Sequence, residues 1–145
     1  MSIDAKFIGK TWPAQSYDVC KEKIKEYAKA IKNPDPHYVD EDFAKKSKYG
    51  CIIAPPTFCV VFGAYLIEPI FFDNELNLNL AMLVHGEQEF EFYEVIKAGD
   101  TVTTTARISH IQNKEKLDVI SVELLSKNQS GRDVCKGIYT FVVRK

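Results

Sequence analysis

A short proline-rich stretch carries the residues best suited to acid–base chemistry. His37 follows Asp35 by two positions, and an imidazole beside a carboxylate can take up or release a proton near neutral pH. Its neighbours are poorer bases, because the phenol of Tyr38 has an ordinary pKa of about 10 and the amide of Asn33 does not titrate. His37 is therefore a candidate acid–base residue with Asp35 as partner, and the alternative is a solvent-exposed loop histidine.

Two further histidines lie in the second half of the chain. His85 precedes Glu87 on what reads as the polar face of a strand, where it can line a ligand site. The alternative is a structural hydrogen bond, either in the core or across a dimer interface. His110 lies late in another strand and is assigned no role.

The cysteines do not form a metal-binding pattern. No two cysteines form a CxxC pair, and no cysteine lies at zinc-ligand spacing from a histidine. We therefore expect neither a metal nor a cofactor. We expect small, buried, reduced thiols in a cytoplasmic protein at Cys20, Cys51, Cys59 and Cys135.

The composition fits one globular domain over residues 1–145. A net charge of −1 with mixed Lys and acidic residues gives no reason to expect nucleic acid or an anionic membrane as partner. The longest apolar stretch, 58–67, is too short to span a bilayer, and residues 1–6 contain no apolar signal segment.

The first half of the chain is predicted to be helical. Apolar residues recur at helical spacing over 20–31, with Asp18 as the expected N-cap and the Asn-Pro-Asp-Pro run of 33–36 as the stop. Asp40 can cap a second, short helix that closes near Gly50.

A third helix is expected to begin at Pro55-Pro56-Thr57 and to run to about Ile67. It is apolar nearly all round, which predicts that it is buried. Gly63 would allow a neighbouring strand or helix to approach closely.

The second half reads as strands. Alternation over 82–93 places Val84 and Phe90 on one face, and His85 with Glu87 on the other. The turn at 98–100 and the hairpin at 128–131 separate three further strands over 102–111, 117–125 and 134–143. An apolar helix with antiparallel strands wrapped around it predicts an α+β fold.

Two sequence blocks carry a resemblance to the MaoC-like hydratase/dehydratase family. The first joins Asp35-Pro36, Asp40 and Phe43-Ala44 to an apolar run that includes Ile53. The second runs from Leu83 to Phe90 and continues through Ala98-Gly99-Asp100. Within the family, the runs Asn33-Pro34-Asp35 and Ala54-Pro55-Pro56-Thr57-Phe58 most resemble the substrate-binding, non-catalytic subunit of the mycobacterial two-chain 3-hydroxyacyl-ACP dehydratase. The resemblance implies a single hot-dog domain with an antiparallel sheet wrapped around a long central helix.

The resemblance also implies the residues that should dehydrate a 3-hydroxyacyl thioester. The family uses an Asp/His pair for proton transfer and a backbone N–H at the start of the central helix for the thioester oxygen. When the family motif is aligned with this sequence, Asn33 stands at the position of the Asp and Tyr38 at that of the His. The position of the family's His-Gly pair is occupied by Pro55-Pro56. Proline lacks an N–H, so the nearest remaining donor is Thr57 N–H. The resemblance therefore implies that the catalytic pair is missing from this chain's own motif.

The expected function follows from these departures. The resemblance implies an acyl-CoA or acyl-ACP thioester as ligand, and a homodimer or a heterodimer with a homologous hot-dog chain. The expected substrate-binding residues are Tyr38, Ile53, Ala54, Pro55, Thr57, Phe58, Phe62 and His85. A non-catalytic subunit beside a catalytic chain is the first hypothesis. The alternatives are a homodimeric enoyl-CoA hydratase that uses His37 or His85, and a non-enzymatic acyl-thioester-binding module.

Overall fold

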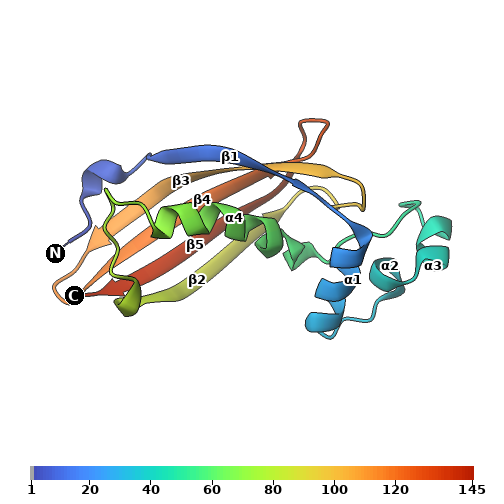
Figure 1. Cartoon of the computed structure of the whole chain (residues 1–145), viewed down its shortest axis with the longest axis horizontal. Helices are drawn as coiled ribbons and strands as arrows, with labels where there is room; N and C mark the ends of the chain where they lie inside the picture. Colours follow the sequence, from blue (N-terminus) through green and yellow to red (C-terminus); the bar gives the residue numbers. More distant parts are fainter. Residues whose placement is uncertain (1) are drawn as a thin grey trace.

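A five-stranded antiparallel sheet organises the computed structural model, which describes residues 2–145. The strand order is β1-β3-β4-β5-β2, so β1 and β2 form the two edges. Figure 1 shows a helix, α4, lying along one face of the sheet. The strands are β1 (Thr11–Asp18), β2 (Leu83–Phe92), β3 (Thr101–Asn113), β4 (Leu117–Lys127) and β5 (Asp133–Arg144).

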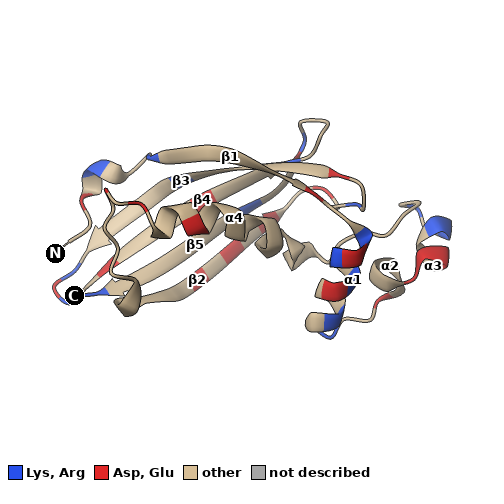
Figure 2. Ribbon diagram, in the orientation of Figure 1, with Lys and Arg blue, Asp and Glu red and all other residues tan. Residues whose placement is uncertain are grey.

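The remaining helices gather beyond one end of the sheet (Figure 1). This group is formed by α1 (Lys21–Ala30), α2 (Pro36–Val39) and α3 (Glu41–Lys46), and it carries many of the charged residues (Figure 2). The path then enters α4 (Cys59–Phe71) through a 3₁₀ turn, η2 (Pro56–Phe58). Two more 3₁₀ turns are η1 (Ala5–Phe7) and η3 (Leu80–Met82).

The predicted helices of the first half are present, with one wrong cap. Asp40 caps α3 by accepting a hydrogen bond from Phe43 N at 3.0 Å, as expected. Asp18 does not cap α1, because it ends β1 and accepts from the Thr101 hydroxyl at 2.9 Å. The N-cap of α1 is Cys20, which makes no side-chain capping bond and is exposed, contrary to the prediction of a buried thiol.

The central helix differs from the prediction in length and in burial. It continues through Pro69 to Phe71, beyond the expected end near Ile67. One face packs on the sheet, but the opposite face is open and Tyr65 is 56% exposed. The expectation of full burial was wrong because the sheet of one chain covers only one side of the helix.

Strand β1 was not predicted. It carries Pro13, and its pairing with β3 shifts register between Trp12 and Gln15. A proline and an irregular register are tolerated at the edge of a sheet but weaken the alternating pattern by which strands are recognised.

A β-bulge at Gly86 changes which face His85 occupies. Pairing with β5 shifts between His85, which lies opposite Phe141, and Glu87, which lies opposite Thr140. The His85 ring therefore lies against Tyr139 and Phe141 on the helix-facing side, with centroids 5.8 and 5.0 Å apart. The predicted placement of His85 on the same face as Glu87 was wrong, because simple alternation cannot include an extra residue.

The turn before β3 is held by a buried carboxylate. Asp100 accepts hydrogen bonds from Lys97 N at 2.8 Å and from the Gln129 side chain at 2.9 Å. Gln129 in turn accepts from Thr101 N at 3.1 Å. The predicted Ala-Gly-Asp turn is thus tied to the hairpin between β4 and β5.

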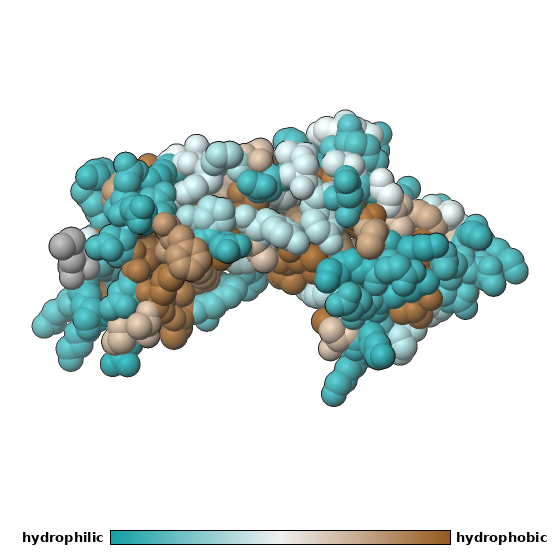
Figure 3. All heavy atoms as spheres, viewed as in Figure 1, coloured by the Kyte–Doolittle hydropathy of each residue, from teal (hydrophilic) through white to brown (hydrophobic). Residues whose placement is uncertain are grey.

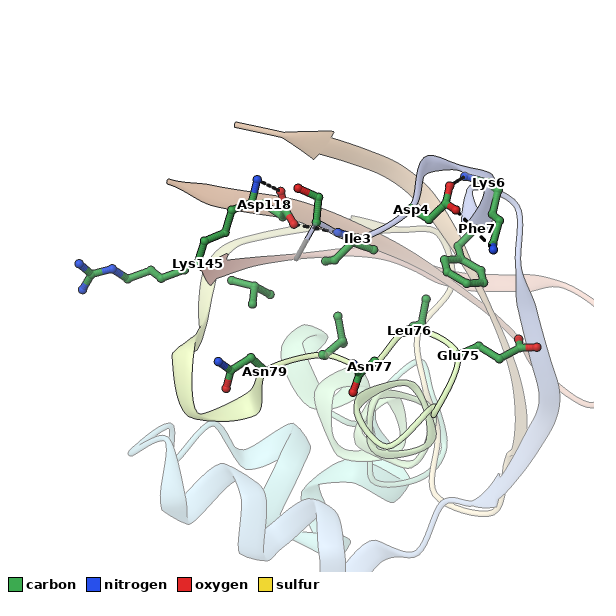
Figure 4. A pocket seen from close by; sticks show the side chains of 14 residues that line it. Ile3, Asp4, Lys6, Phe7, Glu75, Leu76, Asn77, Asn79, Asp118 and Lys145 are labelled. Carbon is green, nitrogen blue, oxygen red and sulfur yellow. Dashed lines mark hydrogen bonds and ion pairs between the residues drawn. The ribbon is translucent and has the colours of Figure 1, made fainter. Parts of the chain in front are cut away.

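A second buried carboxylate lies at the other end of the sheet (Figure 4). Asp118 is 1% exposed and accepts from Ile3 N at 2.8 Å and from Asn113 Nδ2 at 2.9 Å. The ammonium of Lys145 lies 3.0 Å from the same carboxylate. Asp118 therefore joins the segment before β1 to the end of β5.

Candidate functional site

The motif loop is held between α1 and α2 by short-range hydrogen bonds. Asn33 N donates to Ala28 O at 2.9 Å, which closes the end of α1. Asp35 is the N-cap of α2 and accepts from His37 N at 2.9 Å, and Pro36 occupies the first turn. Proline suits this position because its missing N–H would have no partner there.

A cavity of about 280 Å³ opens beside this loop, and we call it the Tyr38 cavity. Four of its lining residues belong to the predicted site: Tyr38, Ile53, Ala54 and Pro56. The others are Tyr49, Phe92, Tyr93, Glu94, Val95, Ile96, Val134 and Cys135.

Backbone bonds fix both walls of the Tyr38 cavity. Ile53 N donates to His37 O at 3.1 Å, which ties the wall to α2. Ala54 N donates to Ile96 O at 2.8 Å, and Ala98 N donates to Ile52 O at 2.9 Å. The segment before α4 is thereby aligned with the segment that follows β2.

Tyr38 brings a neutral hydroxyl to this cavity. Burial raises the pKa of its phenol above the ordinary value, and the negative charge of Asp35 acts in the same direction. The phenol therefore stays protonated at neutral pH, so it can donate a hydrogen bond to a ligand oxygen but is a poor base.

Asn33 lines a different cavity from Tyr38. This Asn33 cavity, of about 580 Å³, is lined by Lys25, Ala28, Lys29, Lys32, Asn33, Pro34 and Val39. The Asn33 side chain accepts from Asp35 N at 3.3 Å, so it is occupied in shaping the loop. The two positions that the family motif assigns to the catalytic pair do not line one common cavity.

His37 does pair with Asp35, as the sequence suggested. Nδ1 of the ring lies 2.8 Å from Asp35 Oδ1, and the backbone N–H and ring of His37 hold the pKa of Asp35 below its ordinary value. The ring also packs edge-on against Phe43 and Tyr49, with centroids 4.9 and 5.9 Å away. His37 does not line the Tyr38 cavity.

The two prolines before α4 offer no donor to an oxyanion, and the backbone N–H of Thr57 is the nearest donor that remains. Pro55 and Pro56 have no N–H, and Pro55 is fully buried. The hydroxyl of Tyr27 lies 2.8 Å from Oγ1 and 3.2 Å from the carbonyl oxygen of Thr57, so the Thr57 side chain is already engaged.

Two expected lining residues belong to the core. Phe58 and Phe62 are 0% and 2% exposed, and both contact the ring of Tyr17, with centroids 6.3 and 5.9 Å apart. Neither lines the Tyr38 cavity. In the structure described over 2–145 they support the start of α4 and do not form the wall of that cavity.

His85 lies far from the Tyr38 cavity within one chain. The cavity residue Phe92 lies on the same strand as His85. Their partners on β5, Phe141 for His85 and Cys135 for Phe92, are six residues apart, which corresponds to about 20 Å of strand. Its Nε2 donates to Glu87 O at 3.0 Å, across the bulge. His85 therefore stabilises the bulge and does not join Tyr38.

The cavity residues that the sequence reasoning missed come from β5 and from the segment after β2. Val134 and Cys135 are ordinary strand residues by pattern, and 93–96 carries no motif, so only the fold brings them to the site. The Cys59 thiol donates to Pro56 O at 3.3 Å, and the neighbouring Cys135 thiol together with burial raises the pKa of Cys59. A protonated Cys59 is not a nucleophile at neutral pH.

Two searches over the described residues were negative. Among residues 2–145, no group of three or more His, Cys, Asp or Glu side chains is arranged to hold a metal ion. Within the same range, no helix combines the length and apolar character needed to cross a bilayer.

Comparison with known proteins places the chain in a family. Residues 6–137 match the family model described as the FAS1-like, dehydratase domain region. A UPF0336 protein of Saccharopolyspora erythraea is 36% identical over 145 residues, covering 99% of this chain and 93% of the relative.

Solved structures share the fold at lower identity. The C-terminally truncated HadBC (3R-hydroxyacyl-ACP dehydratase) complex of Mycobacterium tuberculosis gives a TM-score of 0.83 at 23% identity, covering 98% of this chain and 99% of the other. The MaoC-like dehydratase of Rhodospirillum rubrum gives a TM-score of 0.72 at 18% sequence identity, covering 95% of this chain and 92% of the other. This chain belongs to the FAS1-like dehydratase-region family and has the hot-dog fold of the MaoC-like dehydratases.

Proposed function

We propose that this chain is a non-catalytic, acyl-thioester-binding subunit that pairs with a catalytic hot-dog chain of the (R)-3-hydroxyacyl-CoA/ACP dehydratase type. One observation carries the proposal. The two positions where the family places its acid–base pair hold Asn33 and Tyr38, and these residues line separate cavities. The oxyanion position is occupied by Pro55-Pro56, which donates no hydrogen bond.

The Tyr38 cavity has walls that can hold an acyl group, but it lacks the groups needed for catalysis. Its walls include the apolar side chains of Ile53, Val95 and Ile96, and an acyl chain is stabilised by the removal of apolar surface from water. The Tyr38 hydroxyl can donate to a thioester oxygen. Without a base near the α-carbon, the bound ligand would not react.

A two-chain assembly is part of the proposal. Strand β2 is an edge of the sheet, and its last residue, Phe92, lines the Tyr38 cavity with Tyr93. A partner strand added to β2 would lie next to this wall and could complete it. The mycobacterial dehydratase that shares this fold is itself a complex, HadBC. We also propose a cytoplasmic location, which the four free cysteines support.

The test is a hydration assay of the purified chain with crotonyl-CoA, paired with calorimetry of the same ligand. We expect heat of binding without measurable turnover. Loss of general acid–base assistance alone corresponds to roughly 10²–10⁴-fold in rate. Substantial turnover by the unmodified chain would contradict the proposal.

The second candidate is a homodimeric hydratase with an altered active site. The observation in its favour is the His37–Asp35 pair at 2.8 Å, a geometry that could serve a general base. Turnover that disappears in His37→Ala or His85→Ala would establish it. A protein that binds crotonyl-CoA but stays inactive with every hot-dog partner would instead be a binding module.

A further inference from the structure

Of the two sheet edges, β2 is the one open to pairing. Strand β1 is interrupted by Pro13, which has no N–H, and by the register shift between Trp12 and Gln15. Strand β2 is ten residues long, and its only irregularity in the described chain is the bulge at Gly86. An edge of this length presents a row of unpaired backbone groups to a second strand.

Exposed apolar side chains concentrate around the same edge. Half of the exposed large hydrophobic residues in the described chain lie between positions 80 and 95: Leu80, Met82, Val84, Phe92, Tyr93 and Val95. Figure 3 shows apolar atoms on the underside of the molecule near η3, beside a hollow under the sheet. Apolar surface clustered on an open edge is typical of a protein–protein interface.

The outer face of β2 adds a row of negative charge. Glu87, Glu89 and Glu91 lie opposite Thr140, Ile138 and Lys136 of β5, on the face turned away from α4. Glu91 is neutralised by Lys136 at 3.0 Å, whereas Glu87 and Glu89 form no ion pair within residues 2–145 and are exposed. Acidic residues in β2 are visible as red bands in Figure 2.

Antiparallel pairing of β2 with a second copy would bring like charges together. A two-fold axis at Gln88 sets Glu87 of each copy opposite Glu89 of the other. An axis at Glu89 instead sets the two Glu89 side chains opposite each other. Like charges on directly opposite residues destabilise a strand pair, so both of these central registers, which pair most of β2, meet the repulsion.

We propose that the acidic row of β2 selects the partner of this chain: a homologous hot-dog chain whose edge strand carries Lys or Arg at the facing positions, in preference to a second copy. The inference rests on the two-chain assembly of the proposed function. The apolar residues supply affinity for a partner strand, and Glu87 and Glu89 supply specificity. Lys or Arg on the partner strand would attract these carboxylates, whereas the same carboxylates on a second copy would repel them.

The experiment compares the association of the wild type with itself and with a copy whose β2 edge has the opposite charge. The wild type is mixed with a differently tagged Glu87→Lys/Glu89→Lys copy at low ionic strength, and association is measured by analytical ultracentrifugation. We expect the mixed pair to associate at least about tenfold more tightly than wild type with itself, and the difference to shrink as salt is added. The matched control is Glu22→Lys/Glu26→Lys on α1, where both side chains are more than 70% exposed. This control makes the same change in net charge and should produce no such gain.

A second variant keeps the test decisive if the lysine variant does not fold. Glu87→Gln/Glu89→Gln removes the repulsion without adding charge, and it should self-associate more tightly than the wild type. A tight wild-type homodimer, unchanged by salt and by either substitution, would overturn the inference. That result would leave the proposed lack of catalysis untouched, since the crotonyl-CoA assay decides it separately.

Discussion

The phenol of Tyr139 lies directly against Gly63 of α4. A Cβ on residue 63 would stand 2.6 Å from Tyr139 Oη, which is too close for a methyl group, and in a tight contact of 3.3 Å with Cδ2 of Leu124. Gly63 was predicted to mark a close approach to the helix, and the position of β5 confirms it. The sheet can therefore cover α4 at this point only because residue 63 has no side chain.

Gly63→Leu should destabilise the protein by about 1–3 kcal/mol or more, because the added side chain must displace the buried Tyr139 ring. Urea unfolding of the variant and of Ala64→Leu would measure the effect. Ala64 is the next residue of α4 and is exposed, so its substitution should cost far less. Equal stability of the two variants would mean that α4 packs on the sheet differently.

Tyr38→Phe should weaken the binding of crotonyl-CoA about threefold to tenfold, which corresponds to one neutral hydrogen bond. The apolar wall of the Tyr38 cavity remains, so binding should weaken and not disappear. Calorimetry measures the change, with His37→Ala as the control because His37 does not line this cavity. A loss of affinity in His37→Ala alone would place the ligand on the other side of α2.

Restoring the family motif should not create a hydratase in this chain alone. In Asn33→Asp/Tyr38→His/Pro56→Gly, the new carboxylate would project into the Asn33 cavity and the new imidazole into the Tyr38 cavity. General acid–base catalysis requires both groups within hydrogen-bond reach of one substrate. Crotonyl-CoA hydration by the triple variant, well above that of the parent, would show that the two side chains do meet around one ligand.

Asp118 should make the stability of the fold depend on acid pH. Burial opposes its ionisation, but hydrogen bonds from Asn113, Ile3 N and Lys145 outweigh it and lower the pKa below the ordinary value. The folded state therefore binds this proton less readily than the unfolded state. The stabilisation is present at neutral pH and is lost as pH falls below about 4, the unfolded value, towards the folded pKa.

Asp118→Asn should remove the part of the acid dependence that comes from this carboxylate. It should also lower the free energy of unfolding at neutral pH by about 1–3 kcal/mol. The free energy of unfolding in urea, measured from pH 7 to pH 3, gives both numbers. Asp42→Asn, at an exposed position of α3, is the comparison that should leave the curve unchanged. Parallel curves for wild type and Asp118→Asn would contradict the assignment.

Much of the fold could be predicted from the sequence because the relevant signals are local. The amphipathic spacing of α1, the Asp40 cap and the alternation in β3 to β5 each act within a few residues. Strand β1 was missed because Pro13 and its irregular register hide the alternation, and only pairing with β3 defines it.

The site was predicted less completely for the same physical reason. Four residues that the family resemblance pointed to, Tyr38, Ile53, Ala54 and Pro56, line one cavity, and their role in ligand binding stays a prediction. The family motif could not show that Asn33 faces another cavity, because a side chain's direction depends on the geometry of the turn after α1. The contributions of Val134 and Cys135 depend on long-range packing that no short motif encodes.

The bulge at Gly86 also has a consequence for comparing relatives position by position. Residues before the bulge follow one frame of alternation and residues after it follow the opposite frame, so Leu83 and Phe90 both face α4 although they are an odd number of positions apart. A relative without the extra residue would need a one-residue gap at this point. Aligning it without that gap would match inward-facing side chains of one protein with outward-facing side chains of the other.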